Sequence, residues 1–75
     1  MLDAKIVGKV IKATREEKKI SQEVLSGLAD IGRTHLSAIE RGERKPTLDT
    51  IFKISGALNI NPSELVRMIE IKINK

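Results

Sequence analysis

The spacing of apolar residues is the feature that most constrains the fold of this chain. Every stretch longer than six residues repeats its apolar positions with the roughly 3.6-residue period of an α-helix, and none shows the alternation of a β-strand. Residues that favour helix caps or turns separate these stretches. The sequence therefore predicts an all-α fold of five short helices, in one domain that spans residues 1–75.

Cap residues place the boundaries of these helices. Ser21 and Thr47 are good N-caps for the second and fourth helices. Gly42 and Asn59 accept the left-handed backbone that ends a helix. The expected helices cover about residues 4–18, about eight residues after Ser21, residues 33–41, the stretch from Thr47 to Asn59, and the stretch that follows a capping box at residues 61–64.

The length of the chain limits its core. A chain of 75 residues buries a smaller share of its surface than a large domain does, and small folds often add disulfides, a metal or a partner subunit. There is no cysteine and His35 is the single histidine, so we expect no disulfide, no metal site and no cofactor. We therefore expect the small core to be stabilised by association with a second copy of the chain.

Composition excludes several classes of function. Phe52 is the only aromatic residue, which argues against a platform that stacks single-stranded nucleic acid. One histidine without a thiol, paired carboxylates or a glycine-rich phosphate loop predicts no enzymatic activity. No apolar run approaches the roughly 18 residues of a membrane span, and the N-terminus is too charged for a secretion signal. The expected location is the cytoplasm, with no membrane partner.

The third expected helix has two contrasting faces. Leu36 and Ile39 lie on one side, which we expect in the core. A major-groove helix needs short polar side chains and arginine on its outer face, because bulky residues would hold it away from the base edges. An ordinary solvated helix face is the alternative, which the three-residue turn before this helix and the basic loop after it disfavour. The opposite side carries Thr34, Ser37, Ala38 and Arg41, with Arg33 able to reach round from the first turn.

The net charge of +4 is unevenly distributed, with the excess of base in residues 1–20 and 33–45. Such a balance suggests a polyanionic partner, although many soluble domains carry a similar charge.

Three short runs occur at a specific mutual spacing. SQEVL occupies residues 21–25, RTHLSAIERG occupies residues 33–42 and PTLDTI occupies residues 46–51. Over residues 8–66 the chain resembles the Cro and phage-repressor type of helix-turn-helix domain, the xenobiotic-response-element family. Among its members, the free-standing controller proteins of restriction-modification systems are similar in length and in the run at residues 33–42.

This resemblance implies a compact lambda-repressor-like fold with a central helix-turn-helix, and double-stranded DNA, read in the major groove, as the partner. The implied base contacts are Arg33, Thr34 and Ser37, and the implied phosphate contacts are Gln22, Arg41, Arg44 and Lys45. For Arg44 and Lys45 the alternative is a solvated loop.

The family also pairs the positions of Arg15 and Glu40 in a partly buried salt bridge, which fastens the first helix to the end of the third. Two residues depart from the family pattern. Asp30 stands where glycine is usual in the turn, and it can adopt positive φ at modest cost. Gly32 stands where serine or threonine commonly caps the third helix. His35 is expected to be a partly exposed helix residue without a special role.

The last two helices hold more apolar residues than one small core needs. Surplus apolar surface usually marks an interface, so we expect a homodimer that presents two recognition helices to a pseudo-palindrome. The alternative is that Phe52 and Met68 complete the core and the tail at residues 71–75 frays. The expected dimer contacts, partly in a C-terminal segment at residues 67–75, are Phe52, Val66, Met68, Ile69 and Ile71.

The sequence thus favours a sequence-specific DNA-binding transcription regulator that represses or activates by occupying an operator as a homodimer. One alternative is a DNA-binding antitoxin whose C-terminal apolar surface holds a toxin. Another is a protein-interaction module that keeps the fold without binding DNA. Gln22, Arg33, Arg44 and Lys45 argue against this second alternative.

Overall fold

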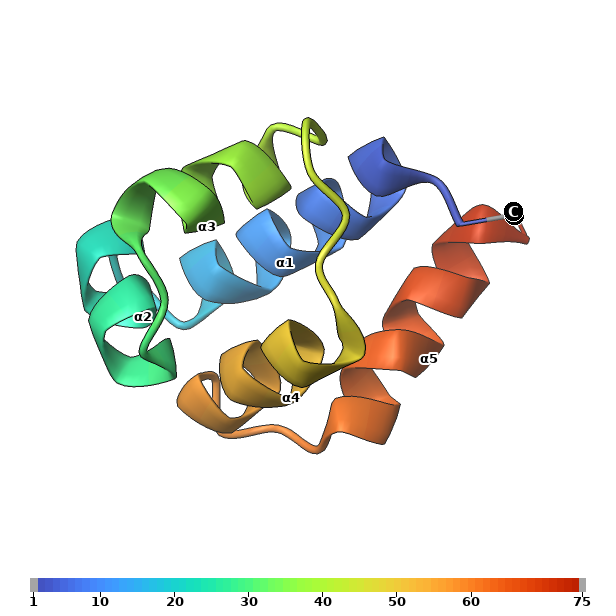
Figure 1. Ribbon diagram of the computed structural model, residues 1–75. Coiled ribbons are helices and arrows are strands. Elements are labelled where there is room, and N and C mark those ends of the chain that lie inside the picture. The colour runs from blue at the N-terminus through green and yellow to red at the C-terminus, as the bar shows by residue number, and fades with distance from the viewer. Residues whose placement is uncertain (1, 75) are drawn as a thin grey trace.

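The computed structural model describes residues 2–74, and within this range the chain forms helices and loops but no strand (Figure 1). The all-α expectation is therefore confirmed. The helices are α1 (Ala4–Glu17), α2 (Gln22–Ala29), α3 (Arg33–Glu40), α4 (Leu48–Ala57) and α5 (Pro62–Ile73).

Local hydrogen bonds explain where the helices begin. The hydroxyls of Ser21 and Thr47 each accept a backbone N–H from the first turn of the following helix, both at 3.1 Å. At the start of α5 the backbone N–H of Asn61 donates to the carboxylate of Glu64 at 3.1 Å. These bonds satisfy backbone N–H groups at the helix starts, which have no acceptor within the helix itself.

The helix ends differ slightly from the expected ones. Asp30 and Asn59 adopt left-handed backbone with φ of 56° and 60°, as their residue types allow. Lys19 does the same at φ 60°, and α1 ends at Glu17. The third helix ends at Glu40, because Arg41 is its C-cap. Helix α5 continues to Ile73, so most of the C-terminal segment at residues 67–75 is helical.

Helix α1 packs against α3 and α5, while α2 packs against α3 and α4 (Figure 1). The buried face of α1 is centred on Val7 and Ile11, whereas Ala13 is exposed. The buried core comprises Val7, Val10, Ile11, Leu25, Ala29, Leu36, Ile39, Ile51, Ile54, Leu58, Leu65 and Ile69.

Three residues that share the apolar periodicity lie outside this core. Val24, Leu28 and Leu48 are 46%, 65% and 70% exposed. The short α2 and α4 pack against each other and bury only the apolar residues at the centre of each face. Residues at the edges of those faces therefore remain in contact with solvent.

Gly8 determines how closely α1 and α3 approach. A Cβ atom at this position would lie 2.3 Å from the carbonyl oxygen of Ile39 and 2.6 Å from that of Glu40. Both obstacles are backbone atoms at the end of α3, so no side-chain rotation could relieve the overlap. The two helices meet here backbone against backbone, which only glycine permits.

We expect Gly8→Ala to destabilise the fold by about 2 kcal/mol, since overpacking outweighs the gain in helix propensity. Urea unfolding followed by circular dichroism measures the change. Gly27→Ala is the matched control, because a Cβ at Gly27 would meet nothing within 4 Å. It should be neutral or stabilise α2 by up to about 1 kcal/mol. Equal midpoints for Gly8→Ala and the wild type would show that α1 and α3 are farther apart than the structure places them.

Candidate nucleic-acid interface

Helices α2 and α3 are joined by a three-residue turn at residues 30–32. Asp30 ends α2 in left-handed conformation, and the N–H of Ile31 donates to the carbonyl oxygen of Ser26 at 3.0 Å. Gly32 is the N-cap of α3 and provides no side-chain cap. Both departures from the family pattern are thus accommodated within an intact turn.

The two faces of α3 are largely as expected. Leu36 and Ile39 are fully buried, whereas Arg33 and Thr34 are exposed and Ser37 is half-buried. The expectation that Ala38 lies on the outer face is wrong, because Ala38 is only 8% exposed and belongs to the inner face. The outer face is therefore polar and narrow, and it carries arginine at its first position.

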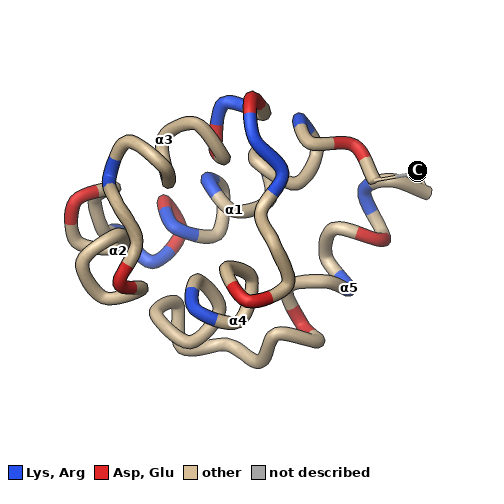
Figure 2. Tube along the Cα trace, viewed as in Figure 1, with Lys and Arg blue, Asp and Glu red and all other residues tan. Residues whose placement is uncertain are grey.

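The segment after α3 continues this surface. Arg44 and Lys45 are exposed, and neither forms an ion pair with any residue between 2 and 74. Figure 2 shows Lys and Arg at the start of α3 and along the loop that follows it. Basic residues therefore lie at both ends of α3 and along the loop to Lys45, with Glu43 between Arg41 and Arg44.

Arg41, at the end of α3, has local partners that the sequence analysis missed. Its Nε and Nη2 donate to the Glu43 carboxylate at 2.9 and 3.1 Å, and its Nη1 donates to the hydroxyl of Ser37. The hydrogen bonds from Arg41 lower the pKa of Glu43, and Glu43 in turn raises the pKa of Arg41. Both side chains are more than half exposed, so solvent weakens this pair.

Arg15 and Glu40 lie together inside the fold. Arg15 Nε and Nη2 donate to the two carboxylate oxygens of Glu40 at 2.7 and 3.0 Å, and Nη1 donates to the carbonyl oxygen of Ile20 at 2.9 Å. The side chains are 11% and 2% exposed. The hydrogen bonds to Glu40 raise the pKa of Arg15 above its usual value, against the opposing effect of burial.

Gln22 begins α2 and is half-buried beside the end of α3. Its Nε2 donates to Oε1 of Glu40 at 2.9 Å, a bond that the sequence analysis did not foresee. No sequence pattern links residues 22 and 40, because their proximity depends on how α2 and α3 are packed.

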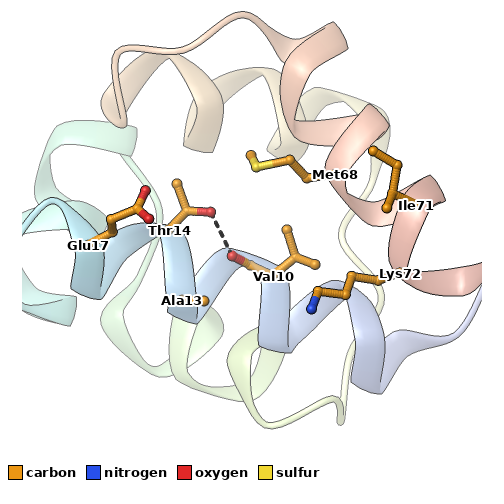
Figure 3. A pocket seen from close by; sticks show the side chains of 7 residues that line it. All are labelled: Val10, Ala13, Thr14, Glu17, Met68, Ile71 and Lys72. Carbon is orange, nitrogen blue, oxygen red and sulfur yellow. Dashed lines mark hydrogen bonds between the residues drawn. The ribbon is translucent and has the colours of Figure 1, made fainter. Parts of the chain in front are cut away.

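The five residues expected at a dimer interface do not form one surface. The expectation that Ile69 contacts a partner at the surface is wrong, because Ile69 is 5% exposed and belongs to the core. Met68 and Ile71 line a cleft of about 250 Å³ between α1 and α5, shown with its side chains in Figure 3. Val66 instead lines a groove of about 280 Å³ with Leu48. At about 100° per residue, Val66 and Ile71 are about 140° apart on α5.

Leu48 was missed as a surface residue because its spacing matches the core positions of α4. It is 70% exposed, and Phe52, one turn later, is 56% exposed. Val66 and Leu2, which also line the groove, are 46% and 44% exposed. We call these four residues the α4–α5 apolar face.

Two other kinds of site find no support among residues 2–74. No group of three or more His, Cys, Asp or Glu side chains could hold a metal ion. None of the described helices combines the length and apolar character needed to cross a membrane.

Comparison with known proteins places this geometry in a family. The family described as helix-turn-helix matches residues 11–65, which include α2, α3 and the turn between them. The chain belongs to this helix-turn-helix family. It is 43% identical over 72 residues to control protein C.MunI of a Mycoplasma species, covering 93% of this chain and 97% of that protein.

Two further members extend the comparison. The immunity repressor of Bacillus phage phi105 is 42% identical over 60 residues, which is 80% of this chain but only 42% of the repressor. The chain thus spans less than half the length of that relative. The restriction-modification controller protein C.Esp1396I, solved as a tetramer with its natural 35 base-pair operator, is similar in structure with a TM-score of 0.89 and 31% identity. That similarity covers 100% of this chain and 99% of that one.

We expect Glu40→Ala in this helix-turn-helix chain to lower the free energy of unfolding by about 3 kcal/mol, because the charge of Arg15 is left buried without its partner. The urea midpoint measures the loss. Glu43→Ala removes a carboxylate from an exposed pair and should leave the midpoint nearly unchanged. Similar midpoints for the two variants would contradict burial of the Arg15–Glu40 pair.

Proposed function

We propose that this helix-turn-helix chain is a sequence-specific DNA-binding regulator of transcription. The observation that carries the proposal is the outer face of α3, which is narrow, polar and continuous with the basic loop to Lys45. This shape and charge suit a helix that enters the major groove while the loop holds the backbone beside it. Relatives named as a repressor and a control protein support this function.

The exposed residues of α3 are assigned to the bases. Arg33 suits bidentate donation to O6 and N7 of guanine, and Thr34 and Ser37 suit single hydrogen bonds to base edges. The remaining contacts are to phosphates, which fix the position of α3 without reading sequence. They are assigned to Gln22, Arg41, Arg44 and Lys45.

We further propose that the active form is a homodimer built on the α4–α5 apolar face. Leu48, Phe52 and Val66 are each about half exposed or more, and burying such a surface against a second copy is favourable. A two-fold axis there sets two α3 helices about 34 Å apart, one turn of DNA. The structure of C.Esp1396I as a tetramer on its operator supports assembly of this chain on DNA.

The proposed mechanism is occupancy of an operator. A site that overlaps a promoter gives repression, and a site beside it allows the bound dimer to touch polymerase and activate. The similarity to C.MunI supports a controller of a restriction-modification system as the more specific role. The function takes place in the cytoplasm with the DNA, and no enzymatic step is part of it.

Selection of bound duplexes from a random pool tests this function directly. We expect enrichment of a pseudo-palindrome whose half-sites lie about one helical turn apart. Arg33→Ala should relax the preference at one position of each half-site and cost about 1–3 kcal/mol of binding. Lys45→Ala should instead weaken all sequences alike and flatten the slope of log K against log salt by about 0.9. Recovery of unenriched sequences would count decisively against sequence-specific binding.

Sedimentation of two charged variants tests the interface. We expect Phe52→Glu to give a monomer, because it places a charge within the α4–α5 apolar face that the dimer would bury. Ile71→Glu is the matched control, since Ile71 is 55% exposed but lies on the other side of α5. It should leave the dimer intact. If Ile71→Glu separates the subunits and Phe52→Glu does not, the interface lies over the α1–α5 cleft instead.

A further inference from the structure

The carboxylate of Glu40, at the end of α3, binds side chains from two other helices. It accepts two hydrogen bonds from Arg15 of α1, and its Oε1 accepts a third from Nε2 of Gln22 at 2.9 Å. Because only 2% of the Glu40 side chain is exposed, this cluster lies inside the fold. Gln22 is half-buried and connects the cluster to the proposed DNA-binding surface.

The chemistry of the carboxylate decides which end of the Gln22 amide faces Glu40. An ionised carboxylate only accepts hydrogen bonds, whereas a carboxamide has a donor end and an acceptor end. Turning the amide round would place its oxygen against the carboxylate and leave Oε1 of Glu40 with one donor fewer. Nε2 carries two hydrogens, so one remains available while the other stays on Glu40.

We infer that Glu40 is a positioning residue for binding the DNA backbone. It holds the Gln22 amide so that the second hydrogen of Nε2 is available to a phosphate oxygen at the start of α2, where free backbone N–H groups also favour an anion. Arg15 balances the charge of Glu40, which would otherwise repel that phosphate. The inference rests on the proposed DNA binding, and it makes the contribution of Gln22 depend on two residues that touch no DNA.

The side-chain amide signals of Gln22 in NMR test the inference on the unmodified protein. We expect one amide hydrogen to be shifted downfield and protected from exchange before DNA is added, because it is bound to Glu40. The other should shift when a duplex of arbitrary sequence is added at low ionic strength, since phosphate contacts do not depend on sequence. Two rapidly exchanging signals typical of a free amide would overturn the inference.

A second experiment measures whether the effect of Gln22 depends on Glu40. Gln22→Met removes the amide at similar size and should weaken duplex binding about fivefold, the effect of one hydrogen bond. The double substitution Arg15→Met with Glu40→Leu replaces the ion pair by apolar side chains, a change that folds often tolerate. In that background the amide has lost its anchor, and Gln22→Met should weaken binding about twofold or less.

Lys45→Ala is the matched control, because a phosphate contact outside the cluster should cost the same in both backgrounds. Equal effects of Gln22→Met in the two backgrounds would overturn positioning by Glu40 while leaving DNA binding intact. Failure of the wild-type chain to bind any duplex would instead refute the proposed function. Circular dichroism at the titration temperature checks folding, and the NMR result decides if the double substitution unfolds the chain.

Discussion

The close approach of α1 to the end of α3 is the constraint on which the rest of the structure depends. Gly8 allows the two backbones to touch, and Arg15, two turns later on the same side of α1, reaches Glu40. Burial of two charges is costly, and here three hydrogen bonds from Arg15 and one from Gln22 offset that cost. Without the close contact between α1 and α3, the Arg15–Glu40 pair would be more exposed to water and therefore weaker.

This contact also determines how the second and third helices are presented. Turn residues 30–32 limit how α3 can leave α2, and the Glu40 cluster fixes the other end of α3 against α1 and α2. A helix held at both ends by backbone turns and a buried ion pair can keep its outer face free of packing. The polar residues of that face are therefore available for recognition without serving stability.

The small size of the chain explains its uneven surface. Five short helices bury mainly the central apolar residues of each, so leucine, valine and phenylalanine at the edges of those faces stay in solvent. In a larger domain a further layer would cover them. Here they gather in separate places, with the α4–α5 apolar face on one side of α5 and the α1–α5 cleft on the other.

Helix number, helix caps and the turn with left-handed Asp30 follow from the sequence, because they depend on spacing and residue type within a few positions. The family resemblance also implied the Arg15–Glu40 pair. Gly8, the bond from Gln22 to Glu40 and the exposure of Leu48 were decided only by the tertiary structure. Periodicity shows which face of a helix is apolar, but not how near another backbone lies or where a small core ends. Those distances depend on all helices packing at once.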